Sequence, residues 1–264
     1  MSSNLFSQAF SFAKRETNKF ATGQAATGAQ LGAKPKRKAV KERKKLCLDN
    51  AVGVPENLGD WPLRLIIVGT NPSEHAWLTG HSYSHPANWM WRILKGTGIA
   101  PPSIRGAQDC LRMPGDAGVG FLDVGCGHPG TVLSEFSSAT FAEWSVAFYA
   151  RLTAHLQRAA MNAGCACGQC AAPPFVGFAG KRQWCELVNI GRKGKDKITK
   201  VDCGPQSERP AGWPFPPGTA VWVLPSTSGA SPQTNAERFG PYQQLSDQLR
   251  LVNWPRQISC QAPG

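Results

Sequence analysis

The sequence predicts an α/β fold with three layers, in which helices cover both faces of a short parallel sheet. Four short apolar runs recur along the chain, separated by stretches in which apolar residues repeat at helical spacing. The runs lack the alternation of a half-exposed strand, which is typical of parallel strands buried on both faces. Strands that alternate with helices indicate a single three-layer domain with a parallel sheet. With 264 residues and 41% hydrophobic content, the chain is long enough for one such domain.

The first apolar run, residues 65–68, is followed by a turn with catalytic character. Gly69 closes the run, and residues 70–73 (TNPS) lie at the predicted carboxyl end of the strand. Ligands bind at such ends in open α/β sheets. The neutral amide of Asn71 can accept and donate hydrogen bonds but can neither take a proton nor attack. We therefore predict that Asn71 orients a water in a reaction whose leaving group departs largely on its own, as in cleavage through an oxocarbenium-like sugar cation.

An aromatic residue and a predicted helix start follow this turn. Tyr83 offers a flat ring that can stack on a planar heterocycle. Residues 84–88 (SHPAN) are typical of a helix start with Pro86 in the first turn. His85 and Asn88 either reach the ligand or only cap this helix. The expected apolar stripe of the helix consists of Ala87, Met90, Trp91 and Leu94.

Three further strands and two helices are predicted downstream. The strands are residues 119–122, which end at Asp123, then 175–178 and 221–224. Thr140 and Glu143 match a capping box and predict a helix start. The aromatic and aliphatic residues that follow at helical spacing are expected in the core, and the final helix is expected over residues 235–254, before Pro255.

Two separated motifs resemble one family. Residues 69–72 (GTNP), Thr79, Gly80, Tyr83, residues 85–88 (HPAN) and Trp91 are similar to the first motif of the mismatch-specific uracil-DNA and thymine-DNA glycosylases, family 2 of the uracil-DNA glycosylase superfamily. That motif is written G-I-N-P-G, followed by an aromatic residue and H-P-x-N. Residues 221–231 (VWVLPSTSGAS) resemble the second motif, a strand that leads into a P-[NS]-x-S-[GA] loop. The resemblance covers roughly residues 54–254. The departures are Thr70 for Ile, Ser73 for Gly, and Ala230 for a larger wedge residue.

This resemblance implies a fold and a reaction. The fold is that of uracil-DNA glycosylase, and the reaction is monofunctional hydrolysis of the N-glycosidic bond of a flipped uracil, with thymine and other damaged pyrimidines as further candidates. The implied partner is duplex DNA with G·U or G·T mismatches, bound by a monomer without cofactor or metal. Asn71 is the catalytic residue. The base-binding residues are Gly69, Thr70, Tyr83 and Asp123, with Thr79, His85 and Asn88 behind them; the DNA-binding loop carries Ser226, Ser228, Gly229, Ala230 and Ser231.

Ala230 stands where the resemblance implies a side chain that fills the hole left by the flipped base. An alanine is too short for that, and the cost of unstacking is then poorly offset. We therefore expect weak preference for the base opposite the lesion and activity on single-stranded DNA.

Two alternatives to the glycosylase hypothesis remain open. Residues 122–127 (LDVGCG) resemble the glycine-rich motif of S-adenosylmethionine-dependent methyltransferases. His128 and Pro129 stand where the next glycine belongs, and the motif follows a strand that already has its own ligand turn. The second alternative is a protein that recognises a damaged base without removing it, because Thr70 and Ser73 depart from the family pattern.

The charge distribution predicts a polyanionic partner. The net charge is +12, and residues 34–45 hold eight Lys or Arg and one Glu, which gives +7. We predict that residues 1–53 are a disordered basic tail, residues 54–256 a glycosylase domain, and residues 257–264 a second tail. The basic segment favours the nucleus, with a mitochondrion or another organelle containing DNA as the alternative. No apolar run reaches the roughly eighteen residues of a membrane span.

Two segments are predicted to be insertions in the domain, near residues 161–173 and 192–218. The nine cysteines favour a reducing compartment. Cys165, Cys167 and Cys170 lie in the first insertion, but C-x-C-x-x-C lacks the second pair of a strong zinc motif, so zinc binding stays open. Lys181 and Arg182 open a predicted helix, where they either meet a phosphate or remain solvated.

Overall fold

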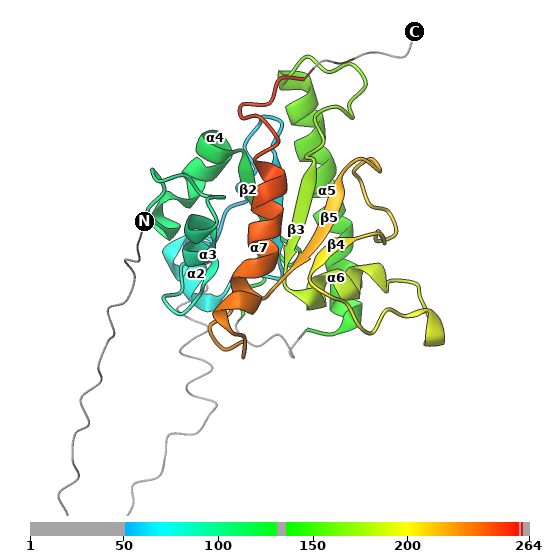
Figure 1. Cartoon of the computed structure of the whole chain (residues 1–264). Coiled ribbons are helices and arrows are strands. Elements are labelled where there is room, and N and C mark those ends of the chain that lie inside the picture. The colour runs from blue at the N-terminus through cyan, green and yellow to red at the C-terminus, as the bar shows by residue number, and fades with distance from the viewer. Residues whose placement is uncertain (1–50, 131–135, 259, 261–264) are drawn as a thin grey trace, which may run out of the picture. The chain divides into compact units, whose positions relative to one another are not determined.

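A computed structural model describes residues 51–130, 136–258 and 260. The sheet has the order β2-β1-β3-β5-β4 (Figure 1). The four predicted strands are β1 (Leu65–Gly69), β2 (Val119–Asp123), β3 (Phe175–Ala179) and β5 (Ala220–Leu224), and they are parallel to one another. Their carboxyl ends therefore meet at one edge. The basic segment 34–45 and most of the predicted N-terminal tail lie outside the described residues.

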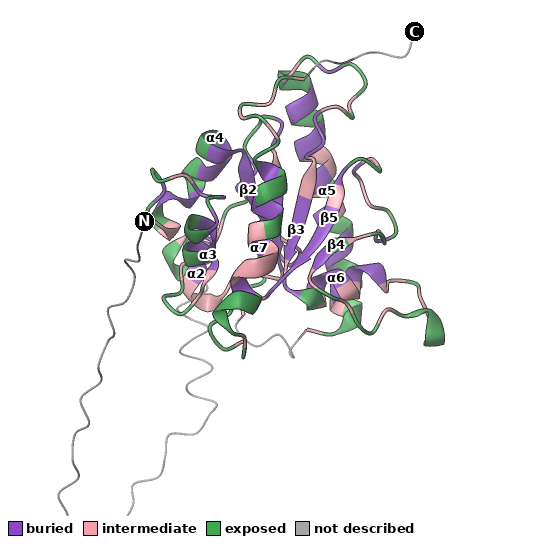
Figure 2. Cartoon of the chain, viewed as in Figure 1, coloured by how far each residue is buried: buried purple, intermediate pink, exposed green. Residues whose placement is uncertain are grey.

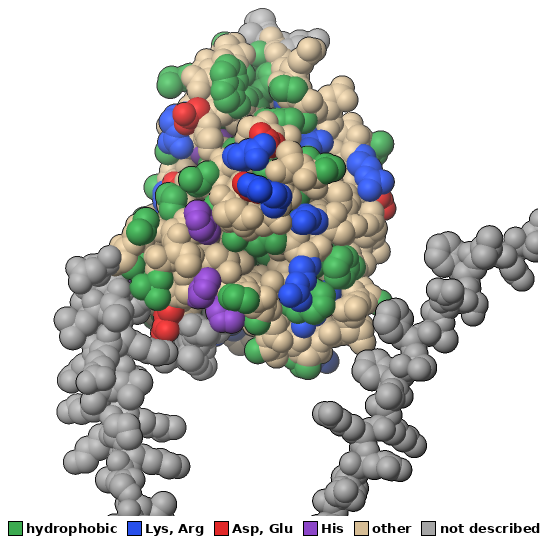
Figure 3. Space-filling model, turned by 90° about the vertical axis from the view of Figure 1, so that its left-hand side faces the viewer, with side chains coloured by type: hydrophobic (Ala, Val, Ile, Leu, Met, Phe, Trp, Pro, Cys, Tyr) green, Lys and Arg blue, Asp and Glu red, His purple; other side chains and the backbone are tan. Residues whose placement is uncertain are grey.

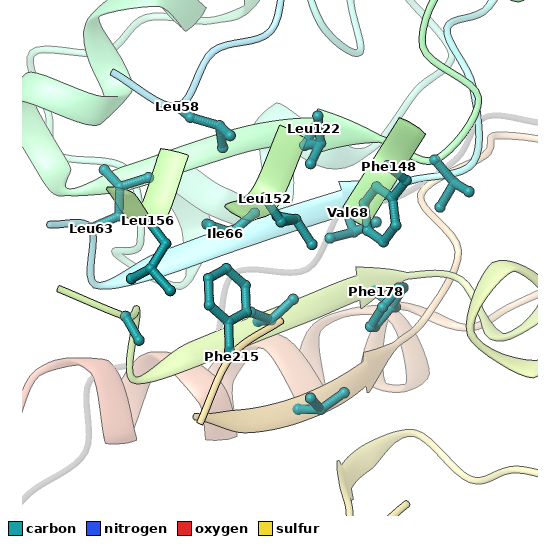
Figure 4. Packing of buried hydrophobic residues seen from close by; sticks show 14 of the residues in the cluster. Leu58, Leu63, Ile66, Val68, Leu122, Phe148, Leu152, Leu156, Phe178 and Phe215 are labelled. Carbon is teal, nitrogen blue, oxygen red and sulfur yellow. The ribbon is translucent and has the colours of Figure 1, made fainter. Parts of the chain in front are cut away.

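The two faces of the sheet are covered by different helices, which confirms the three layers. Alternation along β1 sends Ile66 and Val68 into a cluster with α5 (Ser138–Asn162) and α6 (Lys181–Val188). Leu65 and Ile67 pack on the other face with α3 (Met90–Gly96) and α7 (Asn235–Leu249). Figure 4 shows Ile66 and Val68 among side chains of α5 and β3, and Figure 2 shows buried residues through the strands between the helix layers. Because both faces of the sheet are covered, the strands are apolar throughout.

The shorter elements connect β1 to β2. They are α2 (Glu74–Thr79), the 3₁₀ helix η1 (Ala107–Arg112) and α4 (Met113–Ala117); a second 3₁₀ helix, η3 (Gly194–Asp196), follows α6. Within the described residues, no helix is long and apolar enough to cross a membrane.

Three local predictions were wrong. The capping box at Thr140 is not the start of α5, because Ser137 is the N-cap and its hydroxyl accepts from the Thr140 amide at 3.2 Å. No strand was predicted within residues 192–218, where the structure has β4 (Gly204–Gln206), an antiparallel edge strand on β5 that makes the sheet mixed. The final helix ends at Leu249, five residues before the expected end.

The start of α3 also differs from the prediction. The helix begins at Met90, and the preceding residues, including Pro86, form a turn. Ala87 is exposed and does not join the apolar stripe, whereas Met90, Trp91 and Leu94 are buried as predicted. Pro86 therefore shapes the turn before the helix and not its first turn.

Candidate active site

Two polar side chains meet over the carboxyl end of β1. Gly69 is paired in register with Asp123, the last residue of β2. A Cβ atom at Gly69 would lie 2.0 Å from Asp123 Oδ1 and 2.6 Å from the Tyr83 hydroxyl oxygen. Both groups therefore occupy the space that a side chain at position 69 would fill. Only glycine at this strand end lets the carboxyl and the phenol come together.

A pocket opens beside this pair. Tyr83 and Asp123 line it, together with Asn88, Pro72 and Ser73. The apolar part of the lining comes from the segment before β1, from α2 and from β2, and consists of Val54, Pro55, Ala76, Phe121 and Leu122. A largely apolar wall with a few convergent polar groups is typical of sites that take a small planar ligand.

The amide of Asn71 is held in a single orientation. Its Nδ2 donates to the carbonyl oxygens of His128 at 3.0 Å and Gly130 at 3.2 Å. These acceptors fix which end of the amide is the NH2 group. The loop 124–130, which carries these two carbonyl groups, is joined to the 69–72 turn by backbone hydrogen bonds from Gly125 N to Thr70 O and from Gly130 N to Pro72 O. Asn71 Oδ1 is consequently the end left to accept a hydrogen bond, and no donor to it is found among the described residues.

Tyr83 has an unusual backbone and a buried hydroxyl. Its φ of 55° is the one positive value at a described residue other than glycine. The ring packs edge-on against Phe121, with centroids 5.9 Å apart. The hydroxyl has no hydrogen-bond partner among the described residues, and its burial, followed by the charge of Asp123, raises its pKa well above the usual value. An orphaned buried hydroxyl at a pocket is a partner for the polar edge of a ligand.

Asp123 has a raised pKa. Burial raises the pKa of its carboxyl to about 7, and the charge of Arg151 offsets this only in part. Arg151 comes from α5, donates to the Asp123 backbone carbonyl oxygen at 2.8 Å and pairs with Glu56. It therefore anchors the end of β2 without neutralising the side chain. Near neutral pH the carboxyl divides between its acid and its anion.

The three residues predicted to lie behind the base are found in different places, and not all of them reach the pocket. Asn88 lines the pocket, and its Oδ1 also accepts from the Met90 amide at 2.9 Å, so it serves the start of α3 as well. His85 is exposed, with its Nδ1 accepting from the Ala87 amide. Thr79 is exposed at the end of α2, bonds to Ser84 at 2.7 Å and does not line the pocket. Of these three residues, only Asn88 is placed to touch a bound base.

Comparison with known proteins agrees with this arrangement. The profile of the Uracil DNA glycosylase superfamily matches residues 56–252, which include the whole sheet and all of the pocket lining except Val54 and Pro55. The chain belongs to the uracil DNA glycosylase superfamily. Membership implies DNA glycosylase activity in base excision repair, and it leaves the methyltransferase alternative without support. No curated protein matches the chain.

The predicted DNA-binding loop, residues 226–231, lies against the turn 85–89 that precedes α3. Gly229 approaches Ala87 so closely that a Cβ would lie 2.3 Å from its carbonyl oxygen, and the Trp89 amide donates to Thr227 O at 2.8 Å. Ser228, Gly229 and Ala230 are exposed, and Ser226 and Ser231 are half-buried. Ser226 and Ser228 each accept from a backbone amide two residues ahead. Their oxygens close local turns, while their hydroxyl hydrogens remain able to reach a phosphate.

Arg238 holds this loop, a role that sequence reasoning missed. The side chain lies on α7, is only 4% exposed and donates to the carbonyl oxygens of Ser226, Ser228 and Ser231. It also stacks over the Trp89 ring at 5.1 Å. The sequence shows only an arginine in an amphipathic helix, and nothing local indicates that the carbonyl oxygens of a distant loop surround it.

The surface near α2 suits an anionic partner. Seen from the side of α2, α3 and α4, the lower part of the domain is richer in histidine and basic side chains than in acidic ones (Figure 3). His75, on α2, and His85 have ring centroids 5.3 Å apart. Arg182 on α6 is engaged with the Phe136 carbonyl oxygen and Glu186, so it is less available to phosphate than Lys181, which is exposed.

We expect Arg238→Ala to weaken both the fold and excision from duplex DNA. Three carbonyl oxygens lose a charged donor, which costs about 2 kcal/mol of unfolding free energy, and the loop loses its fixed shape. Thermal melting and single-turnover rates measure the two effects. Arg92→Ala is the matched control, because Arg92 stacks on the same Trp89 ring at 5.0 Å and is exposed. Equal melting temperatures and equal excision rates for the two variants would contradict the role of Arg238 in holding the loop.

Proposed function

We propose that the protein is a monofunctional glycosylase, similar to the mismatch-specific uracil-DNA glycosylases, that hydrolyses the N-glycosidic bond of uracil in mismatched duplexes and also in single-stranded DNA, with thymine as the second candidate base. The orientation of Asn71 carries this proposal. A neutral amide whose NH2 end is fixed on two carbonyl oxygens presents its oxygen to a water, and it serves a reaction that needs no strong base. Among the described residues that line the pocket there is no lysine, which supports hydrolysis over a lyase mechanism through an amine.

The proposed steps follow from these positions. The nucleotide leaves the duplex, and its base enters the pocket beside Tyr83 and Asp123. The sugar stays outside the pocket near Asn71, which directly precedes the lining residue Pro72 in the chain. The bond between N1 and C1′ breaks with its electron pair on the base. Water held by Asn71 Oδ1 attacks C1′ and releases its proton to solvent, which gives a free base and an abasic sugar.

The protonation state of Asp123 selects the base edge that it can bind. A neutral carboxyl donates one hydrogen bond and accepts another, as an amide does, and this matches the O4 acceptor and N3–H donor of uracil. The anion accepts only and repels the charge that develops on the departing base. The acid form is therefore the form that favours uracil excision.

We expect kcat/KM for uracil excision to fall as pH rises through about 7, the pKa of Asp123. Asp123→Asn is expected to flatten this fall, because an amide does not titrate. Rates measured from about pH 6 to about pH 8.5 bracket the transition. A wild-type profile that is already flat through this range, or an unchanged slope in the variant, refutes the role of the carboxyl.

The same substitution has an expected effect on stability. The folded-state pKa lies above the unfolded value, so the favourable contribution of the neutral acid is present at low pH and is lost as pH rises towards 7. Asp123→Asn should therefore raise the melting temperature more at about pH 8 than at about pH 5. This readout does not depend on the reaction.

Strand scission by alkali tests the proposal. Labelled G·U, G·T and A·U duplexes and single-stranded uracil DNA are incubated with the full chain and then treated with hot alkali, which cuts abasic sites. We expect cleavage of G·U above G·T, and activity on single strands because Ala230 fills no hole. Tight duplex binding without alkali-labile product would favour the binding-only alternative.

One departure from the family pattern has a structural reason. Ser73 is the N-cap of α2, and its hydroxyl accepts from the Ala76 amide at 3.2 Å. A serine that caps a helix gives no ground for loss of catalysis.

The location of the protein also stays a proposal: the basic segment 34–45 supports the nucleus.

A further inference from the structure

Four cysteine thiols converge at a place remote from the pocket. Cys165, Cys167 and Cys170 lie in the loop after α5, and Cys260 reaches them from the C-terminal segment. All four sulfur atoms lie within 4.8 Å of one another. In Figure 1 this loop and the C-terminal segment are at the top, whereas the 225–234 loop of the active site is at the bottom. The cluster is therefore independent of the proposed reaction.

The sulfur separations fit one tetrahedral metal ion. The distances are 3.4 Å for Cys165–Cys167, 3.7 Å for Cys165–Cys260 and 3.2 Å for Cys167–Cys170. A ZnS4 tetrahedron with bonds of about 2.3 Å has edges of about 3.8 Å. A disulfide needs about 2.05 Å, so none of these pairs is bonded. Four thiols this close surround room for a single ion and not for a cluster of several irons.

The backbone around the cysteines has the form of a metal knuckle. Gly168, between Cys167 and Cys170, has a φ of 71°, which lets the chain turn sharply. The Gln169 amide donates to Cys167 Sγ at 3.4 Å. Amide donors to a thiolate are the supporting contacts that metal-bound cysteines use.

Arg256 joins the segment that carries Cys260 to the cysteine loop. Its guanidinium donates to the carbonyl oxygens of Cys170 at 3.1 Å and Ala172 at 2.9 Å, and to that of Leu63 at 2.8 Å just before β1. It places a positive charge beside the cluster, where four thiolates and one divalent ion sum to a net charge of −2. The fourth ligand is therefore brought to the loop by contacts other than the cysteines themselves.

We propose that Cys165, Cys167, Cys170 and Cys260 bind one structural Zn²⁺ ion, which fastens the C-terminal segment to the amino end of the sheet. Binding releases the thiol protons to solvent, and four protein ligands leave no open position for catalysis. The sequence motif is incomplete because its fourth cysteine lies 90 residues after Cys170 and is brought close only by the fold.

Metal analysis of the full chain tests this proposal. We expect about one zinc per chain by elemental analysis, and a strong loss of zinc in Cys260→Ser and Cys167→Ser. Cys203→Ser is the matched control, because Cys203 is a free, half-buried cysteine outside the cluster, and it should retain the metal. Cobalt substitution should give the visible bands of a tetrahedral thiolate site.

A chelator supplies a second readout that does not require a variant to fold well. Zinc removal should lower the melting temperature of the wild type by about 5 °C or more, with little further effect on Cys260→Ser. Wild-type protein without metal, or with disulfides among these cysteines, overturns the proposal. Stoichiometric iron in place of zinc overturns the choice of metal. Because metal content is measured directly, failure here leaves the glycosylase proposal untouched.

Discussion

Asn71→Ala is expected to lower the single-turnover rate of uracil excision about 100-fold or more, the scale seen when an oriented polar group is lost from an active site. The amide of Asn71 is fixed on the carbonyl oxygens of His128 and Gly130, so its oxygen has one direction in which to hold a water. Alanine removes that acceptor and leaves the pocket lining unchanged, because Asn71 is not among the lining residues. Binding of a G·U duplex should therefore stay within a few fold of wild type.

Gel-shift titration and rapid-quench kinetics separate the two effects. Asn162→Ala is a suitable control, because this exposed amide donates to Asp60 far from the site. An Asn71→Ala enzyme that turns over at the wild-type rate refutes the assignment of the water to this residue. A parallel loss of duplex binding would instead make Asn71 a positioning residue.

Gly69→Ala is expected to abolish most excision through a different route. A methyl group here would lie 2.0 Å from Asp123 Oδ1 and 2.6 Å from the Tyr83 hydroxyl oxygen, so both side chains must leave their positions. The backbone at Gly69 is ordinary strand, hence the effect comes from this collision and not from backbone strain. We expect a rate loss of about 100-fold or more, comparable with the loss of a catalytic group, together with a lower melting temperature.

Two further variants isolate the collision. Gly115→Ala adds a methyl group where no atom lies within 4 Å and should be neutral in both assays. Adding Asp123→Ala to Gly69→Ala removes the closest obstacle and should recover part of the melting temperature without recovering excision. A double variant that melts below both single variants would show that the two positions do not oppose each other in this way.

The sheet could be predicted from sequence because each strand is buried on both faces. An unbroken apolar run such as residues 65–68 has few other solutions, and the polar turn after it marks the carboxyl end. The errors occurred where the signal is local and weak. Ser137 and Thr140 are both acceptable N-caps. Only the hydrogen bond from the Thr140 backbone amide to the Ser137 hydroxyl identifies the true start of α5. The strand Gly204–Gln206 contains Pro205 and forms because β5 offers it a free edge.

The active site divides in the same way. Asn71 and Asp123 could be named because each lies at or just after a recognisable strand end, and Tyr83 because of its planar ring and its place in the first motif. The approach of Tyr83 and Asp123 over Gly69 and the hydrogen bonds from Arg238 to the 226–231 loop depend on contacts between residues far apart in the chain. Cys260 is the extreme case, because nothing near it in the sequence indicates a ligand.

Direct detection of the released base tests the central claim most closely. The full-length protein is incubated in molar excess with a G·U duplex, and the free bases are identified by mass spectrometry. The Asn71→Ala variant, purified in the same way, controls for contaminating activity. We predict free uracil, one per duplex, from the wild type and almost none from the variant. An intact duplex with no free uracil, or equal release by both proteins, would contradict the assignment of uracil excision to this site.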